Sequence, residues 1–99
     1  MPDVKRVLRV NPSTMHRELQ GEGVLLQLDT GKYFGLDEMG QRMWELIVAH
    51  GDFDRVVQAL LEEYDVEREV LAADLTRLVD ELRASSLIEI ETVGAPEKD

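Results

Sequence analysis

The stretch that most constrains the fold of this 99-residue chain runs from Gly23 to Ile47, where the spacing of apolar residues changes. Residues 24–28 and 32–36 have the pattern of two strands joined by an Asp-Thr-Gly turn. Gly31 suits that turn because it has no Cβ atom to oppose a positive φ angle. Apolar residues then recur at helical spacing, and Asp37 stands where a helix N-cap is expected. The sequence therefore predicts a tight hairpin that runs directly into a helix.

Two further segments with strand character come before the hairpin. Residues 14–19 can pair with residues 24–28 through a short turn at residues 21–23, which makes a three-stranded antiparallel sheet. Residues 4–10 are expected to form an extended lead-in that ends at the turn signal Asn-Pro-Ser. A small sheet with one apolar face needs a second layer to pack on.

Three helices are predicted to supply that layer. They span about residues 38–50, 53–64 and 67–85, and Gly51 and Asp52 mark the end of the first and the N-cap of the second. The expected inward positions recur every three or four residues: Met39, Met43, Leu46, Ile47, Phe53, Val56, Val57, Leu60, Leu61, Leu71, Leu75, Leu78, Val79 and Leu82, with Trp44 on a flank. Residues 87–91 alternate apolar and acidic side chains, which indicates a short terminal strand.

These elements predict an α+β fold of winged helix-turn-helix type, with a small N-terminal three-stranded antiparallel sheet followed by three helices. The chain is long enough for one hydrophobic core, and 43% of its residues are hydrophobic. The expected organisation is an extended N-terminal lead-in over residues 1–13, one domain over residues 14–91 and a disordered tail over residues 92–99.

The charge balance opposes nucleic acid as a partner. Asp and Glu number 21 against 11 Lys and Arg, which gives a formal net charge of -10. The third predicted helix, which would read DNA in a winged-helix protein, is net acidic, whereas binding to phosphates depends largely on Lys and Arg. No apolar run is long enough to span a bilayer, and no signal peptide is evident. We expect no nucleic-acid partner, no membrane partner and a cytoplasmic location.

No pattern in the sequence indicates catalysis. Cysteine is absent, which excludes thiolate zinc sites and thiol nucleophiles. His16 and His50 lie on different predicted elements without metal-ligand spacing, and the serines lack a nucleophile elbow. The sequence therefore predicts a protein that is not an enzyme and that has no catalytic residues, no metal site and no cofactor.

The strand over residues 32–36 is the most informative candidate for function. At a sheet edge it would present unpaired backbone N–H and C=O groups, and Gly35 would permit close approach of another backbone. An extended segment of another chain would then add as a strand, with alternate side chains entering a groove beside the third helix. An ordinary hairpin strand with two core aromatic residues, Tyr33 and Phe34, explains the same pattern.

Three motifs in the central part of the chain carry a family resemblance. They read Leu-Leu-Gln-Leu-Asp-Thr-Gly-Lys-Tyr-Phe-Gly-Leu at residues 25–36, Asp-Glu-Met-Gly at residues 37–40 and Trp-Glu-Leu-Ile at residues 44–47. Together they resemble PqqD-like peptide chaperones, the precursor recognition elements of ribosomally synthesised and post-translationally modified peptides (RiPPs). Asp37 and Met39 replace the family's Asn and Thr, and the Tyr-Pro-Glu hairpin of pyrroloquinoline quinone pathway members is absent. The chain is therefore more similar to standalone members found beside lasso-peptide enzymes.

The resemblance implies binding without catalysis. Such domains capture the leader of a precursor peptide by strand addition and present it to a modifying enzyme, such as a radical SAM enzyme or a leader peptidase or cyclase. The implied peptide-binding residues are Lys32, Tyr33, Phe34, Gly35 and Leu36 of the strand and Asp74, Arg77, Leu78 and Glu81 of the third helix. The alternatives are a winged-helix transcription regulator or another acidic protein-interaction domain. A homodimer through exchanged or paired strands stays open.

Overall fold

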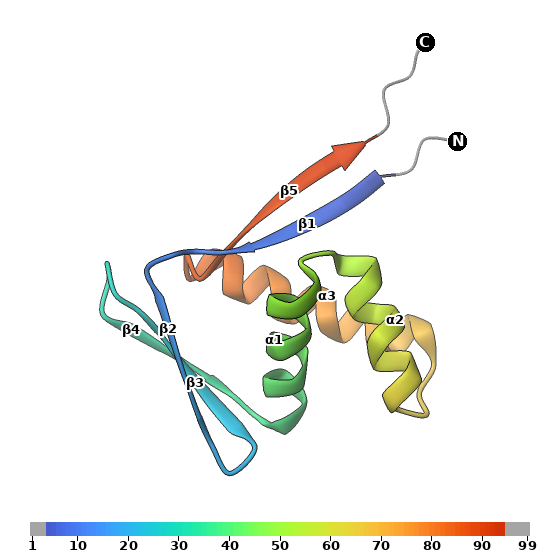
Figure 1. Ribbon diagram of the computed structural model, residues 1–99, viewed down its shortest axis with the longest axis horizontal. Helices are drawn as coiled ribbons and strands as arrows, with labels where there is room; N and C mark the ends of the chain where they lie inside the picture. Colours follow the sequence, from blue (N-terminus) through green and yellow to red (C-terminus); the bar gives the residue numbers. More distant parts are fainter. Residues whose placement is uncertain (1–3, 95–99) are drawn as a thin grey trace.

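The computed structural model describes residues 4–94 as an α+β fold with three helices and two small antiparallel sheets (Figure 1). The elements, in chain order, are β1 (Val4–Val10), β2 (Thr14–Leu19), β3 (Glu22–Gln27), β4 (Lys32–Leu36), α1 (Glu38–His50), α2 (Phe53–Glu63), α3 (Arg68–Ala84) and β5 (Ile88–Gly94). The predicted fold class, a three-stranded sheet followed by three helices, is confirmed. None of the described helices is long and apolar enough to cross a membrane.

The three-stranded sheet has the order β2-β3-β4, and both neighbouring pairs are antiparallel. Gln20 and Gly21 have φ angles of 57° and 83° and make the turn between β2 and β3. Gly31 has a φ angle of 75° just before β4, which confirms the left-handed conformation expected for this glycine. The order places β4 at one end of the sheet.

The lead-in strand has a partner that its sequence does not indicate. β1 pairs along its whole length with β5, from Val4 opposite Gly94 to Val10 opposite Ile88. The two strands extend together from the helices toward both chain ends (Figure 1). The expectation of a disordered tail is therefore wrong for residues 92–94, which belong to β5. Residues 95–99, the remainder of that predicted tail, lie outside the described residues.

β1 also packs on the helical layer. Leu8 is buried, and its N–H donates to the carbonyl of Gly51 at 2.9 Å. The Arg6 guanidinium lies 3.7 Å from the centroid of the Phe53 ring at the start of α2, a cation–π contact. The segment predicted as a lead-in is thus joined to the rest of the fold from residue 4 onward, because it supplies a core side chain.

The helices lie close to their predicted bounds because each of the first two has strong local signals. Asp37 Oδ1 accepts from the Gly40 N–H at 2.8 Å, and Gly51 ends α1 in the left-handed conformation with a φ angle of 65°. Asp52 Oδ1 accepts from the N–H groups of Asp54 and Arg55 in the first turn of α2, at 2.9 and 3.2 Å. Both predicted N-caps are confirmed, since a capping carboxylate satisfies helix N–H groups that have no partner within the helix.

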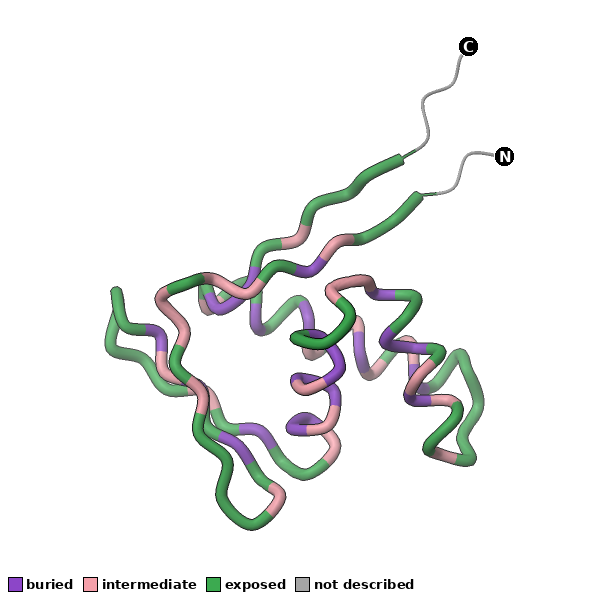
Figure 2. Tube along the Cα trace, viewed as in Figure 1, coloured by how far each residue is buried: buried purple, intermediate pink, exposed green. Residues whose placement is uncertain are grey.

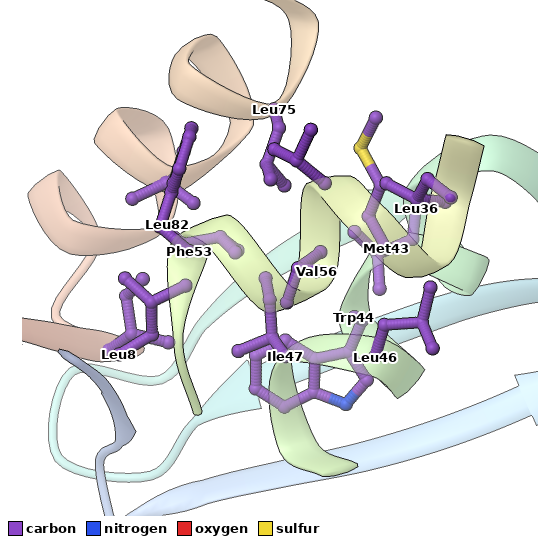
Figure 3. Close-up of a cluster of buried hydrophobic side chains, with 14 of the residues drawn as sticks. Leu8, Leu36, Met43, Trp44, Leu46, Ile47, Phe53, Val56, Leu75 and Leu82 are labelled. Atoms are coloured by element: carbon purple, nitrogen blue, oxygen red, sulfur yellow. The ribbon is translucent and has the colours of Figure 1, made fainter. Parts of the chain in front are cut away.

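One hydrophobic cluster joins the helices to β1, β5 and the three-stranded sheet (Figures 2 and 3). Most of the inward positions predicted from helical spacing are buried, whereas Met39, Leu61 and Leu78 are half-buried. Trp44, expected on a flank, is buried beside Ile47 (Figure 3). The sheet covers this side of α1, and the His16 ring of β2 lies 6.0 Å from the Trp44 ring.

Candidate functional site

β4 presents the open edge of the three-stranded sheet. Within residues 4–94 it pairs only with β3, so its other side has no backbone partner. Gly35 is exposed, and a Cβ atom built there would meet no atom within 4 Å. Backbone N–H and C=O groups along such an edge are available to an added strand.

A groove lies between β4, the first half of α1 and the middle of α3, with a cavity volume of about 480 Å³. Its lining residues are Phe34, Gly35, Leu36, Asp37, Met39, Gly40, Met43, Asp74, Arg77, Leu78 and Glu81. Leu36 and Met43 are buried, and Phe34, Met39 and Leu78 are half-buried, so these five side chains make an apolar floor. We call this cavity the groove and its charged residues, Asp37, Asp74, Arg77 and Glu81, the rim.

The structure brings together most of the residues that the sequence singled out. Phe34, Gly35 and Leu36 from β4 line the groove with all four predicted residues of α3, namely Asp74, Arg77, Leu78 and Glu81. Lys32 and Tyr33 do not line it, although they belong to the same strand. Tyr33 is 73% exposed, and its side chain points to the opposite face of the sheet because side chains alternate along a strand.

The contribution of α1 to the groove was missing from the prediction. Met39 and Met43 line the groove beside Asp37 and Gly40. Helical spacing assigned both methionines to the core, and Met43 is indeed buried. The available signal was the absence of a linker between residue 36 and the helix, since α1 must then begin beside the open edge of β4.

The rim charges have different partners. Asp74 Oδ1 accepts a hydrogen bond from Arg77 Nη2 at 3.0 Å, in an i,i+3 pair on the exposed face of α3. Asp37 is occupied at one oxygen by its role as N-cap of α1. Glu81 is exposed and makes no ion pair within 4.0 Å among residues 4–94. The rim therefore has one carboxylate that is free for another cation.

A polar network joins the sheet to α1 and joins α1 to α2. His16 Nε2 lies 2.8 Å from Gln41 Oε1, and Gln41 Nε2 donates to Glu45 Oε2 at 3.0 Å. Arg42 pairs with Glu45 and also with Glu63 of α2. Hydrogen bonds from Gln41 and Arg42 lower the pKa of Glu45, and the bonds from Arg42 lower the pKa of Glu63.

The open edge and the groove together are suited to binding an extended chain. Residues 4–94 contain no cluster of three or more His, Asp or Glu side chains placed to hold a metal ion. The groove lining has no His, Ser, Thr or Cys side chain. An open sheet edge beside an apolar groove is the geometry by which proteins bind an extended peptide, since the edge supplies backbone hydrogen bonds and the groove receives alternate side chains.

Comparisons with known proteins agree with this geometry. The family model described as "Coenzyme PQQ synthesis protein D (PqqD)" matches residues 22–88. The solved structure "TbiB1 in Complex with the TbiA(beta) Leader Peptide" is similar at 33% sequence identity with a TM-score of 0.77, and the match covers 82% of this chain and 94% of that one. "Lasso peptide synthetase B1 complexed with the leader peptide" has the same fold, with 24% identity, a TM-score of 0.74 and coverage of 83% and 96%. No curated protein sequence matches.

Proposed function

Since this chain belongs to the PqqD family, we propose that it binds the leader region of a RiPP precursor peptide by accepting it as an additional strand on β4. The observation that carries this proposal is the open edge of β4 beside a groove with an apolar floor. Two structures of similar fold are complexes with leader peptides, which supports the same class of ligand for this chain.

The backbone of β4 and the side chains of β4 and α3 would have separate roles in binding. Backbone groups of Lys32 to Leu36 would pair with the leader, and Tyr33 would flank the added strand on the outer face of the sheet. Inward side chains of the leader would lie against Phe34 and Leu78. A leader that becomes ordered on binding loses about 2 to 5 kcal/mol, so backbone bonds and a few apolar contacts give a dissociation constant on the order of 0.01 to 10 µM.

We also propose that the chain binds without catalysis and presents the leader to a separate modifying enzyme, such as a radical SAM enzyme or a leader peptidase or cyclase. The similar solved structures support this, since both are described as complexes with a leader peptide. An affinity in the micromolar range would also allow the leader to be released after each delivery.

Titration of the ¹⁵N-labelled chain tests the proposal, with the leader of the precursor encoded beside this gene as ligand. We expect saturable binding and backbone amide shifts centred on residues 32–36 and on the groove side of α3. Absence of binding, or shifts confined to α2 and the β1–β5 pair, would refute strand addition at β4.

A pair of substitutions at Gly35 provides the matched control. Gly35→Pro removes one backbone N–H and should weaken leader binding at least about tenfold if that N–H faces the added strand. Gly35→Ala keeps the N–H and has open space for its methyl group, so it should bind within about twofold of the native chain. If the folded Gly35→Pro and Gly35→Ala variants bind the leader with equal affinity, the leader does not pair with the backbone N–H of Gly35.

A further inference from the structure

The rim of the groove is predominantly acidic, with three carboxylates and one guanidinium around an apolar floor. We propose that the groove selects a leader in which a Lys or Arg side chain stands two residues from the apolar side chain that enters the groove. This inference rests on the proposed function and specifies the chemistry of the bound segment. The whole chain has a net charge of -10, which also favours a positively charged ligand.

Glu81 is the carboxylate that would receive the cationic side chain. Arg77 is already paired with Asp74 at 3.0 Å, and Asp37 caps α1. Glu81 is exposed, lines the groove and forms no ion pair with any residue from 4 to 94. Lys32, the cation of β4, does not line the groove. Glu81 is therefore the rim carboxylate that a Lys or Arg side chain of the leader would meet.

The spacing of the groove residues sets the position of that cation in the leader. Leu78 and Glu81 are three residues apart on α3, which corresponds to about 4.5 Å along the helix axis. Side chains on one face of an extended strand are two residues, or about 6.7 Å, apart. When an apolar side chain of the leader lies over Leu78, the next inward side chain is near Glu81, and the length of Lys or Arg covers the difference of about 2 Å.

The expected preference is modest because the contact lies at a solvent-exposed rim. Ion pairs of this kind correspond to about a two- to fivefold change in affinity. The preference should also shrink as salt is raised, since exposed charges are screened. The apolar contacts on the groove floor would be little affected by salt.

Selection of displayed peptides by the full 99-residue chain tests the inference with random peptides in place of the natural leader. A library of peptides long enough to span β4 is enriched for binding, and enriched peptides are synthesised and mapped by backbone amide shifts. We expect peptides that shift the amides of β4 to carry Lys or Arg two positions from an apolar residue. Replacing that Lys or Arg by Gln should weaken binding about two- to fivefold.

Two substitutions on α3 separate a direct contact from a general effect of charge. Glu81→Gln should weaken binding of the cationic peptide about two- to fivefold and leave the Gln-substituted peptide unchanged. Asp80→Asn removes an exposed neighbouring charge that does not line the groove and should change affinity less than about 1.5-fold.

The outcomes distinguish failure of this inference from failure of the proposed function. Peptides that shift the amides of β4 without enrichment of Lys or Arg would overturn the charge selection and leave strand addition standing. If Asp80→Asn and Glu81→Gln weaken binding of the cationic peptide equally, the charge selection is also overturned and strand addition still stands. If no enriched peptide shifts the amides of β4, both the selection and the proposed strand addition are overturned.

Discussion

At Gly23 an added methyl group would collide with the polar network that holds the sheet on α1. A Cβ atom at this position would lie 2.0 Å from Gln41 Oε1 and 3.2 Å from Leu36 Cδ1. Gln41 is only 2% exposed and is engaged at both ends of its amide, by His16 and by Glu45. Gly23→Ala therefore forces the glutamine out of its position or moves β3 away from the helix.

The free energy of unfolding should fall by about 1 to 5 kcal/mol. Displacing the Gln41 amide leaves buried polar groups without partners, which costs about 1 to 3 kcal/mol. Crowding against the core costs about 1 to 3 kcal/mol more. The smaller conformational entropy of unfolded alanine offsets about 0.4 to 1 kcal/mol of this loss. For a domain of this size the melting temperature should drop by at least about 4 °C.

Thermal and urea denaturation followed by far-UV circular dichroism measure the effect. Gly35→Ala is the matched control, because its methyl group enters open space in the same sheet. Combining Gly23→Ala with Gln41→Ala removes the colliding group, so the double-mutant cycle should give a coupling energy of at least about 1 kcal/mol. If Gly23→Ala melts within about 2 °C of the native chain, the glutamine moves freely and the reasoning is wrong.

Three further predictions concern the helix pair, a helix end and the groove. The lowered pKa of Glu63 means that its pairing with Arg42 stabilises the fold above the ordinary pKa of 4.5 and that this contribution is lost as the pH falls through the folded-state value. Because both side chains are about one third exposed, Arg42→Met should cost at most about 1 kcal/mol at pH 7 and less at pH 3, by urea denaturation. Gly51→Ala should cost about 1 kcal/mol by thermal denaturation, since the φ angle of 65° disfavours a Cβ atom. Leu78→Ala should weaken leader binding about fivefold in a fluorescence anisotropy titration through lost apolar contact, whereas Val70→Ala, outside the groove lining, should bind as the native chain does.

Much of the fold was predictable because its signals are local. Asp37 and Asp52 cap the first turns of α1 and α2, and Gly51 ends α1, all through contacts within four residues. The helices therefore begin and end close to the predicted positions. Gly31 adopts the conformation that its turn requires. These choices depend on backbone sterics and short-range hydrogen bonds, which neighbouring residues specify.

The candidate site was predictable in part for a different reason. An open sheet edge and the family resemblance predict that the strand at residues 32–36 and one face of α3 bind a peptide. That role in peptide binding stays a prediction. The structure places Phe34 to Leu36 of β4 around one groove with four residues of α3: Asp74, Arg77, Leu78 and Glu81. It adds Met39 and Met43, whose helical spacing was indistinguishable from that of core residues.

The sequence by itself determined the type, order and approximate bounds of the central hairpin and the three helices, because turn glycines, caps and hydrophobic period act over a few residues. Only the tertiary structure decided that β1 pairs with β5, that Trp44 is buried beneath the sheet, and that α1 completes the groove. Those outcomes depend on which faces and edges meet across distant parts of the chain. A period of apolar residues defines a face but not the element that will cover it.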